Sequence, residues 1–229
     1  MTGGLALKST GIVFDSGLRV GPEPHATILY DRSRYQSNGD FKAAGQPDWV
    51  RLPSGLWVLD FNPANPDYVE IPADQTQLDF TSEDFSIIAR VKVEDLTANR
   101  WIFTRGTAFV DGCHFYLIVA GTLRFYTNQA GESQYSTSTT GAIVVGNWYT
   151  VGFSRAGESI RIYIDGVDDT ETAGTHIDPL TSARTAKIGI HDNLVSNPFD
   201  GQIAYLEIWN YALSATQHRK KHDALSGWM

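Results

Sequence analysis

Two pairs of neighbouring carboxylates are the first residues in this chain that could do chemistry. Hydrolysis of a glycosidic bond needs two carboxyl groups flanking the scissile bond, one of them acting as an acid. Glu94-Asp95 and Asp168-Asp169 are adjacent in sequence, so in a strand the two members of each pair point to opposite faces. Both pairs fall at predicted turns, and no Gly-x-Ser-x-Gly elbow is present. We interpret them as solvated turn carboxylates, and a triad assembled from distant residues stays open.

Two histidines have the spacing of a metal site. His218 and His222 are four residues apart on a predicted helix, which can bring two imidazoles to one metal ion. The pattern lacks a glutamate after the first histidine and a third ligand nearby. We therefore expect two exposed histidines. The basic run Arg219–His222 is expected to complement the helix dipole and not to bind a polyanion.

Aromatic side chains could bind sugars, because an exposed ring complements the apolar face of a pyranose. Most of the tryptophans must lie in the core, and Trp148 and Trp209 fall inside alternating strands. A Ser/Thr-rich stretch from Ser133 to Thr140 is expected to be a mobile loop over a sheet. The candidate ligand-binding residues are Trp49, Trp57, Trp101, Tyr126, Asn128 and Tyr135.

Composition narrows the classes of protein. The 229 residues are 42% hydrophobic, 19% charged and carry a net charge of −8, which predicts one globular domain and disfavours nucleic acid as a partner. Cys113 is the only cysteine, so no intramolecular disulfide exists, and we expect it to be a small buried hydrophobe. No segment resembles a signal peptide or a membrane span, so the protein is expected to fold in the cytosol without membrane insertion.

The hydrophobic pattern predicts strands almost throughout. In Phe85–Val93, the residues Phe85, Ile87 and Val91 share one face while Arg90 and Lys92 share the other, a period typical of half-buried strands. Gly-containing turns separate such segments at hairpin spacing. Further strands are expected at 26–30, 49–52, 56–61, 67–71, 100–105, 113–119, 122–128, 148–154, 159–165, 185–190 and 202–209. Only the segment from Ser214, a plausible N-cap, predicts a helix.

The start of the chain has a different amino-acid composition. Residues 1–25 are rich in Gly, Ser and Pro around one short apolar run, Gly11-Ile12-Val13-Phe14. This composition predicts an extended arm that is not a core element, followed by one domain over 26–229. We expect such an arm to pack on another subunit.

The order of short phrases resembles the laminin G-like family of the concanavalin A-like lectins and glucanases. The final strand carries the most informative phrase, Phe199–Ser214, which is similar to the family's F-x-G-x-I-D-E-V-R-I-Y-N-R-A-L-S. The resemblance covers roughly four-fifths of the chain. The other matching segments are Asp31–Ser33 with Ser37–Gly39, Val58–Phe61, Asp67–Pro72, Asp84–Ile87, Gly146–Tyr149 and Ile162–Gly166.

The resemblance implies an all-β jelly-roll sandwich of two antiparallel sheets. Family members often hold one calcium ion, and Asp31, Asn38 and Asp200 are the hard oxygen ligands available in turns. Ala204 replaces an aspartate that is frequent in the family, which weakens transfer of that site. Alternation in the last strand predicts Leu206 and Ile208 in the core and Glu207 facing out. No E-x-D-x-x-E segment of the related glucanases is present.

These observations favour a protein without catalytic activity and without a required cofactor. The resemblance extends to structural proteins of tailed bacteriophages, which predicts a virion surface protein, such as a capsid decoration or tail protein. Its partners would then be other virion subunits and its own copies, assembled in the host cytoplasm. The alternative is a carbohydrate-binding module for a cell-surface glycan, and the least favoured hypothesis is a glycoside hydrolase with an atypical site.

Overall fold

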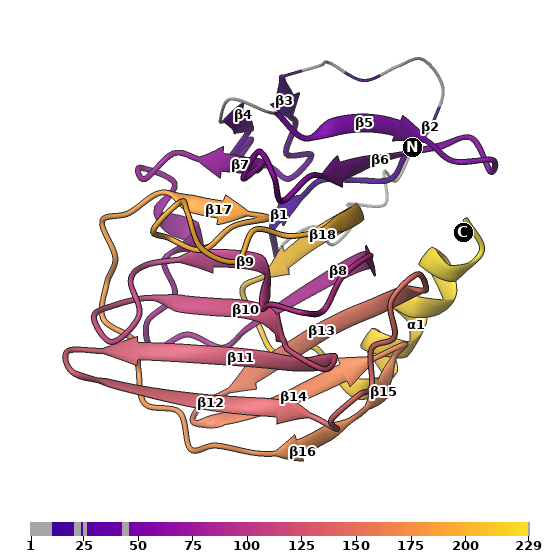
Figure 1. Ribbon diagram of the computed structural model, residues 1–229. Helices are drawn as coiled ribbons and strands as arrows, with labels where there is room; N and C mark the ends of the chain where they lie inside the picture. The colour runs from indigo at the N-terminus through magenta and orange to yellow at the C-terminus, as the bar shows by residue number, and fades with distance from the viewer. Residues whose placement is uncertain (1–10, 21–23, 25–26, 43–45, 229) are drawn as a thin grey trace, which may run out of the picture.

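The chain folds into two facing β-sheets with one helix on the outside (Figure 1). The computed structural model describes residues 11–20, 24, 27–42 and 46–228. Every strand pair in this part of the chain is antiparallel. The jelly-roll-like sandwich implied by the family resemblance is confirmed.

Sheet A has the strand order β15-β14-β13-β8-β18-β6-β2, with β1 also paired to β18 and β5 to β6. It contains the long central strands of the molecule. The bounds are β1 Ile12–Asp15, β2 Arg19–Val20, β5 Asp48–Arg51, β6 Leu56–Phe61, β8 Phe85–Val93, β13 Trp148–Ala156, β14 Ser159–Ile164, β15 Val167–Asp168 and β18 Gly201–Trp209.

Sheet B has the order β16-β12-β11-β10-β9-β17-β7-β4-β3. Its bounds are β3 Ile28–Leu29, β4 Gly39–Lys42, β7 Tyr68–Ile71, β9 Arg100–Arg105, β10 Cys113–Ile118, β11 Thr122–Gln129, β12 Glu132–Ser138, β16 Thr170–Thr172 and β17 Ala186–Ile188. A short 3-10 helix, η1, covers Thr76–Leu78. The Ser/Thr-rich stretch predicted to be a mobile loop is mostly the regular strand β12, because its residues pair with β11 on one side and β16 on the other.

The core lies between the two sheets, where alternate residues of each strand meet. Phe85, Ile87 and Val91 of β8 are fully buried there, as the period of two predicts. Phe125 of β11 stacks on Phe153 of β13 across the sandwich, with ring centroids 3.8 Å apart. Cys113 is buried as expected, and burial raises the pKa of its thiol to about 12. Such a thiol is inert at neutral pH.

The last strand departs from simple alternation. Leu206 and Ile208 are in the core as predicted, but Ala204 faces the opposite side because the register shifts between Ile203 and Tyr205. A bulge inserts one extra residue and so moves side chains from one face to the other. Glu207 does face away from the core, but it is only 1% exposed. Something outside the sheet therefore covers it.

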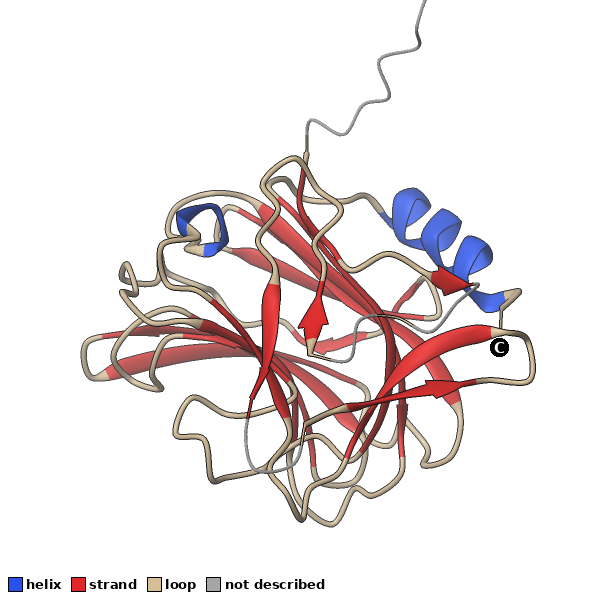
Figure 2. Ribbon diagram, turned by 90° about the horizontal axis from the view of Figure 1, so that it is seen from above, coloured by secondary structure: helices blue, strands red, loops and turns tan. Residues whose placement is uncertain are grey.

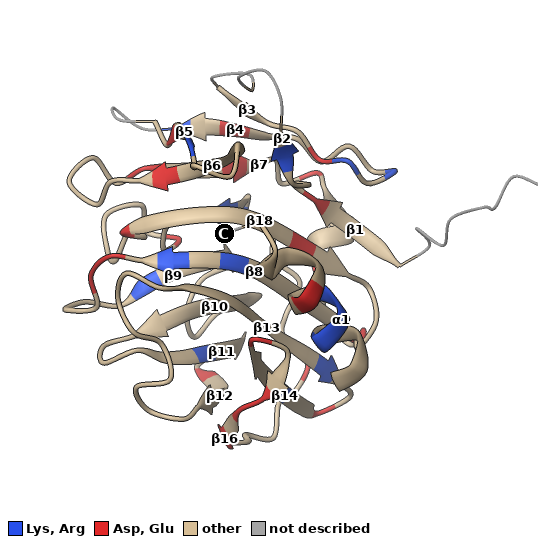
Figure 3. Cartoon of the chain, turned by 90° about the vertical axis from the view of Figure 1, so that its right-hand side faces the viewer, with Lys and Arg blue, Asp and Glu red and all other residues tan. Residues whose placement is uncertain are grey.

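The cover is helix α1, Ala215–Ser226, which lies on the outer face of sheet A (Figure 2). Ser214 is its N-cap in a capping box with Gln217, as predicted. The sequence predicted that the outer face of sheet A meets solvent, but residues on this face are buried beneath the helix and the segment before it. Ser86 is one of them, and it donates a hydrogen bond to the carbonyl of Tyr211. Figure 3 shows basic segments on α1 and on the neighbouring strand β8.

Two predictions about α1 are wrong. His218 is 2% exposed, stacks on Tyr163 and bonds Ser154 Oγ through Nε2 at 2.8 Å, because the helix face that carries it packs on β13. The basic run lies in the middle of the helix and not in its last turn. Lys221 instead pairs with the buried Glu207, with Nζ and Oε2 2.6 Å apart.

The start of the described chain belongs to the sandwich. Val13 and Phe14 are buried in the core, and β1 pairs with β18. The expectation that this apolar run is not a core element is wrong, because a four-residue strand between glycine-rich neighbours finds its partner only in the tertiary structure. The remainder of the predicted arm includes residues 1–10, 21–23 and 25, which lie outside the described residues. The division at residue 25 stays a prediction.

No helix within the described ranges is long and apolar enough to cross a membrane.

Candidate functional site

The outer face of sheet B carries a row of aromatic rings. Alternation in β9 to β12 points Trp101, Tyr116, Tyr126 and Tyr135 away from the core, one from each strand. Neighbouring ring centroids lie 4.1, 6.4 and 5.9 Å apart along this aromatic row. Trp101 and Tyr116 are nearly parallel and cover each other, whereas Tyr135 is 43% exposed. The open surface for stacking is therefore at the Tyr126–Tyr135 end.

Polar groups surround the rings of the aromatic row. Ser133 Oγ donates to Tyr126 Oη at 2.9 Å, which leaves the tyrosine hydroxyl hydrogen to serve as a donor. The guanidinium of Arg124 lies 4.4 Å from the centre of the Tyr135 ring. Flat rings edged by hydroxyl and nitrogen donors match the alternating apolar and polar character of a sugar.

A cavity of about 170 Å³ opens beside the aromatic row. Three lining residues are members of the row, His114 comes from β10, and the loops that follow β9 and β17 supply the others. It is lined by Trp101, Ala108, Phe109, His114, Tyr116, Tyr126 and His191. Apolar walls with a few fixed polar groups are typical of small-molecule sites.

His114 is the polar group at the base of this cavity. It is 2% exposed, and burial lowers the pKa of its imidazole to about 3, so the ring is neutral. Trp101 Nε1 donates to His114 Nδ1 at 3.1 Å, and Thr104 Oγ1 lies 3.0 Å from the same nitrogen. An indole N–H can only donate, so Nδ1 is an acceptor and the proton resides on Nε2. Nε2 has no hydrogen-bond partner among the described residues.

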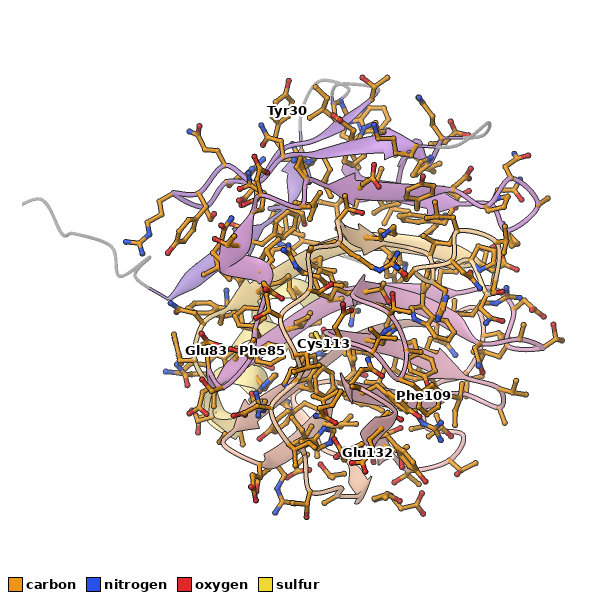
Figure 4. The ribbon with its side chains drawn as sticks, turned by 90° about the vertical axis from the view of Figure 1, so that its left-hand side faces the viewer. Tyr30, Glu83, Phe85, Phe109, Cys113 and Glu132 are labelled. Carbon is orange, nitrogen blue, oxygen red and sulfur yellow. The ribbon has the colours of Figure 1, made fainter. Side chains whose placement is uncertain are left out.

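The loop that carries Phe109 is held by a buried asparagine. Asn128 Oδ1 accepts from Phe109 N at 3.1 Å, and Asn128 Nδ2 donates to the carbonyl of Gly112. Asn128 was a candidate ligand-binding residue, but it is fully buried and positions the loop. Figure 4 shows Phe109 and Glu132 in the lower half of the face turned to the viewer, and Gly131 N donates to the Phe109 carbonyl.

A buried ion pair fixes the second loop. Lys187 of β17 and Asp192 are each 5% exposed at their side chains, with Nζ and Oδ1 3.0 Å apart. Asp192 Oδ2 also accepts from Thr107 Oγ1 at 2.9 Å and pairs with Arg184. The hydrogen bond from Thr107 to Asp192 thus joins the loop bearing Phe109 to the loop bearing His191. Both walls of the cavity are held by the same carboxylate.

The other tryptophan candidates lie elsewhere. Trp49 and Trp57 are half-buried on β5 and β6 of sheet A, so the structure does not bring them to the aromatic row. The Arg19 guanidinium lies 5.4 Å from the Trp49 ring centre and Arg51 lies 6.0 Å from that of Trp57. Trp101 does line the cavity, but it is 6% exposed and acts mainly through its contacts with its neighbours.

The calcium candidates divide between two places. Asp31 accepts four hydrogen bonds, from the backbone N–H groups of Asp15, Ser33 and Ser37 and from the Ser33 hydroxyl. Asn38 Oδ1 accepts from Asp31 N at 2.9 Å. Asp31 lies beside the C-terminal end of β18, because it accepts from Asp15, which pairs with Glu207 of that strand. Asp200 lies at the other end of β18, about 20 Å away along the strand.

These surroundings fit hydrogen-bond acceptors better than metal ligands. The two Asp31 oxygens are occupied by donors, and Asp200 pairs with Arg100 at 3.7 Å. Within the described ranges no group of three or more His, Cys, Asp or Glu could hold a metal ion. Calcium binding stays a prediction of the family resemblance; Asp31 and Asn38 lie together, but Asp200 does not join them.

Asp31→Asn is expected to lower the free energy of unfolding by about 2 kcal/mol, because an NH2 group would face donors that now bond a carboxylate. Urea denaturation measures the change. Dialysis against EDTA is the control: a larger drop in Tm for the wild type than for the variant would show that a metal ion occupies this loop.

One other pair of carboxylates shares a pocket, of about 340 Å³, between β18 and α1. Asp15 and Glu207 are directly opposite in the β1–β18 register. Burial raises the pKa of Glu207, although Lys221 beside it acts in the other direction. Asp15 Oδ1 accepts from Gly17 N at 2.7 Å. With one carboxylate paired to the helix and the other holding a turn, we assign the pair a structural role.

Sequence reasoning missed His114, Tyr116, Phe109 and His191. The signal for two of them was available, since His114 and Tyr116 alternate with the core residue Phe115. That alternation places them on the same face as Tyr126. Nothing in the sequence indicates that the loops of Phe109 and His191 meet over this face.

A comparison of the sequence with known protein families agrees with this fold. Residues 63–217 match a laminin G-like model described as the concanavalin A-like lectin/glucanases superfamily. The chain belongs to this superfamily. No curated protein sequence matches it significantly.

Solved structures with the same fold include binding domains of larger proteins. Domain 4 of AbnA, a GH43 extracellular arabinanase from Geobacillus stearothermophilus in complex with arabinotriose, is 19% identical, with a TM-score of 0.63 over 86% of this chain and 98% of that one. The binding domain of Paraclostridial Mosquitocidal Protein 1 is 12% identical, with a TM-score of 0.70 over 94% and 52%.

A third similar structure is the ligand-binding domain of botulinum neurotoxin serotype D in complex with N-acetylneuraminic acid. It is 14% identical, with a TM-score of 0.65 over 95% of this chain and 52% of that one. The chain therefore spans about half the length of the toxin domains it resembles. At these identities the likeness shows the fold.

Proposed function

We propose that this domain is a non-catalytic carbohydrate-binding module that holds a glycan on the outer face of sheet B. The observation that carries the proposal is the aromatic row with its adjoining cavity. Open tyrosine rings at one end and a walled cavity at the other offer consecutive positions for sugar residues. The arabinotriose complex of a similar domain supports the same class of ligand.

The chemistry of the cavity favours binding over catalysis. Its described lining residues include aromatic rings and neutral imidazoles but no carboxylate, whereas glycoside hydrolysis by the common mechanisms needs two. The carboxylate pairs noted in the sequence are engaged elsewhere: Asp95 with Arg100 and Thr97, and Asp169 with Thr139.

A glycan array with the purified domain tests the proposal. We expect a defined set of saccharides to bind, and Tyr126→Ala to weaken binding of the best one about tenfold, because stacking on this ring is lost. Trp228→Ala is the matched control, since Trp228 is an exposed aromatic at the end of α1. An array without signal, or equal losses in both variants, would contradict the assignment.

The virion structural role stays a prediction from the sequence resemblance, as do virion subunits and further copies of the chain as partners. Glycan binding is compatible with such a role, because a surface protein of a particle can also bind a cell-surface glycan. A mass-spectrometric inventory of purified particles tests it, and absence of the chain from them would contradict it.

A further inference from the structure

His114 holds a donor that the folded chain does not use. Its Nε2 has less than 1 Å² of exposed surface and no hydrogen-bond partner among the described residues. A buried polar atom without a partner costs roughly as much free energy as a lost hydrogen bond and calls for an explanation. The ring lines the cavity beside the aromatic row. An acceptor oxygen placed in that cavity would satisfy the donor.

The tautomer of His114 is set by its neighbours. Trp101 Nε1–H and Thr104 Oγ1 both meet Nδ1, so the proton is held on Nε2. A ligand that reached this nitrogen would therefore meet an N–H, which selects an oxygen acceptor such as a hydroxyl or ring oxygen. The ionisable groups around the imidazole come from two places. Lys187 lies on β17, with His191 and Asp192 in the loop that follows this strand. Tyr116 and Tyr126 belong to the aromatic row.

No Lys or Arg side chain is among the described residues that line the cavity. Asp192 pairs with both Lys187 and Arg184 outside the lining, and Arg124 contacts Tyr135 and Tyr116. A carboxylate buried among the rings would have no cation of its own, which is strongly unfavourable. The net charge of −8 adds long-range repulsion of anions.

Access to the donor requires a lining group to move, because Nε2 has less than 1 Å² of exposed surface. Of the described lining residues, Phe109 alone is more than half exposed, at 55%, and its φ of 61° lies in the left-handed region. Non-glycine residues adopt this region at an energetic cost. Phe109 is therefore the wall of the cavity that a ligand can displace.

We propose that this cavity takes an uncharged sugar residue, which displaces Phe109 and accepts a hydrogen bond from Nε2 of His114. The inference rests on the proposed function and deepens it, since it names the class of sugar and the side chain that selects it. His114 is then a specificity-determining residue, and Trp101 and Thr104 are positioning residues that hold its tautomer.

Calorimetric titration with two neutral probes, arabinotriose and cellotriose, and one acidic probe, N-acetylneuraminic acid, tests the inference. We expect at least one neutral probe to bind and the acidic probe to show no binding. His114→Met should raise the Kd of that neutral probe about threefold to tenfold, because the donor is gone, while His114→Gln should recover part of the loss. Affinity should be constant between pH 8 and 6.

A second measurement separates binding from folding. In ¹⁵N-labelled protein the His114 Nε2 resonance should shift on addition of the neutral probe, whereas a purely structural imidazole would give no shift. The inference would be overturned by tighter binding of the acidic probe, by an unchanged Kd in His114→Met, or by the absence of an Nε2 shift. The proposed function would still stand if Tyr126→Ala weakened glycan binding as expected. An empty glycan array would overturn both.

Discussion

Between pH 6.5 and 4 the protein is expected to lose stability steeply. His114, His176 and His218 are each at most 2% exposed, and burial lowers their pKa values to about 3, 4 and 3. In the unfolded chain a histidine titrates near its ordinary pKa of about 6.5. The unfolded state therefore binds more protons throughout this window, so stability is fully present above pH 6.5 and is lost as the pH falls.

The magnitude is large compared with the stability of a domain. Each buried histidine contributes up to about 1.4 kcal/mol per pH unit, and the three together about 4 kcal/mol per pH unit. Typical domains have roughly 5–15 kcal/mol in total. We therefore expect acid unfolding to begin near pH 5, where carboxylates alone would leave most folded proteins intact.

Urea denaturation at several pH values between 7 and 4.5 measures this slope. His176 is a suitable residue to replace, because within the described part of the chain its two ring nitrogens bond only the hydroxyls of Thr127 and Ser136, both at 2.9 Å. His176→Gln and His218→Gln should each reduce the slope by about one third. Slopes equal to that of the wild type would show that the imidazoles are not the source of acid sensitivity.

Gly112→Ala is expected to destabilise the protein by about 3 kcal/mol or more. Gly112 has a φ of +68°, and a Cβ there would lie 1.9 Å from the carbonyl oxygen of Arg105. The three nearest atoms are backbone atoms of Arg105 and Gly106, so no flexible side chain can move aside, and the strain of the left-handed conformation adds to a steric clash. The turn must open, and with it the loop that carries Phe109.

Gly131→Ala is the matched control. Gly131 also has a positive φ, +79°, and lies at the β11–β12 turn near the same loop, but nothing lies within 4 Å of its added Cβ. We expect about 1 kcal/mol from backbone strain alone. Urea denaturation of both variants gives the comparison, and glycan affinity should fall only in Gly112→Ala. Equal losses of stability would mean that the loop adapts to the extra methyl group.

Much of the fold was predictable because strand alternation is a local property. Phe85, Ile87 and Val91 share a face whichever strands lie beside them, and the capping box of Ser214 is complete within four residues. The family motif in the last strand also predicted which of its residues face the core, except at the bulge beside Ala204. A bulge depends on how two strands pair, so one strand alone does not reveal it.

Of the candidate site, Trp101, Tyr126 and Tyr135 were found from residue type, and the rest was not. Asn128 was chosen as a ligand residue, but its amide is used by the loop around Phe109. Trp101 was predicted to be exposed, but it is buried because its ring stacks on Tyr116. This contact forms only when β9 and β10 are neighbours in the sheet. Which rings remain open is decided by packing between segments and not by their spacing in the chain.

Sequence alone determined the class of fold and the helix start, since each depends on periodicity or on groups a few residues apart. Tertiary structure decided the rest: which strand the first apolar run joins, what lies under α1, and where two loops meet over His114. The physical reason is that burial, pKa and an unpartnered donor are produced by groups distant in the chain, whose approach local patterns do not encode.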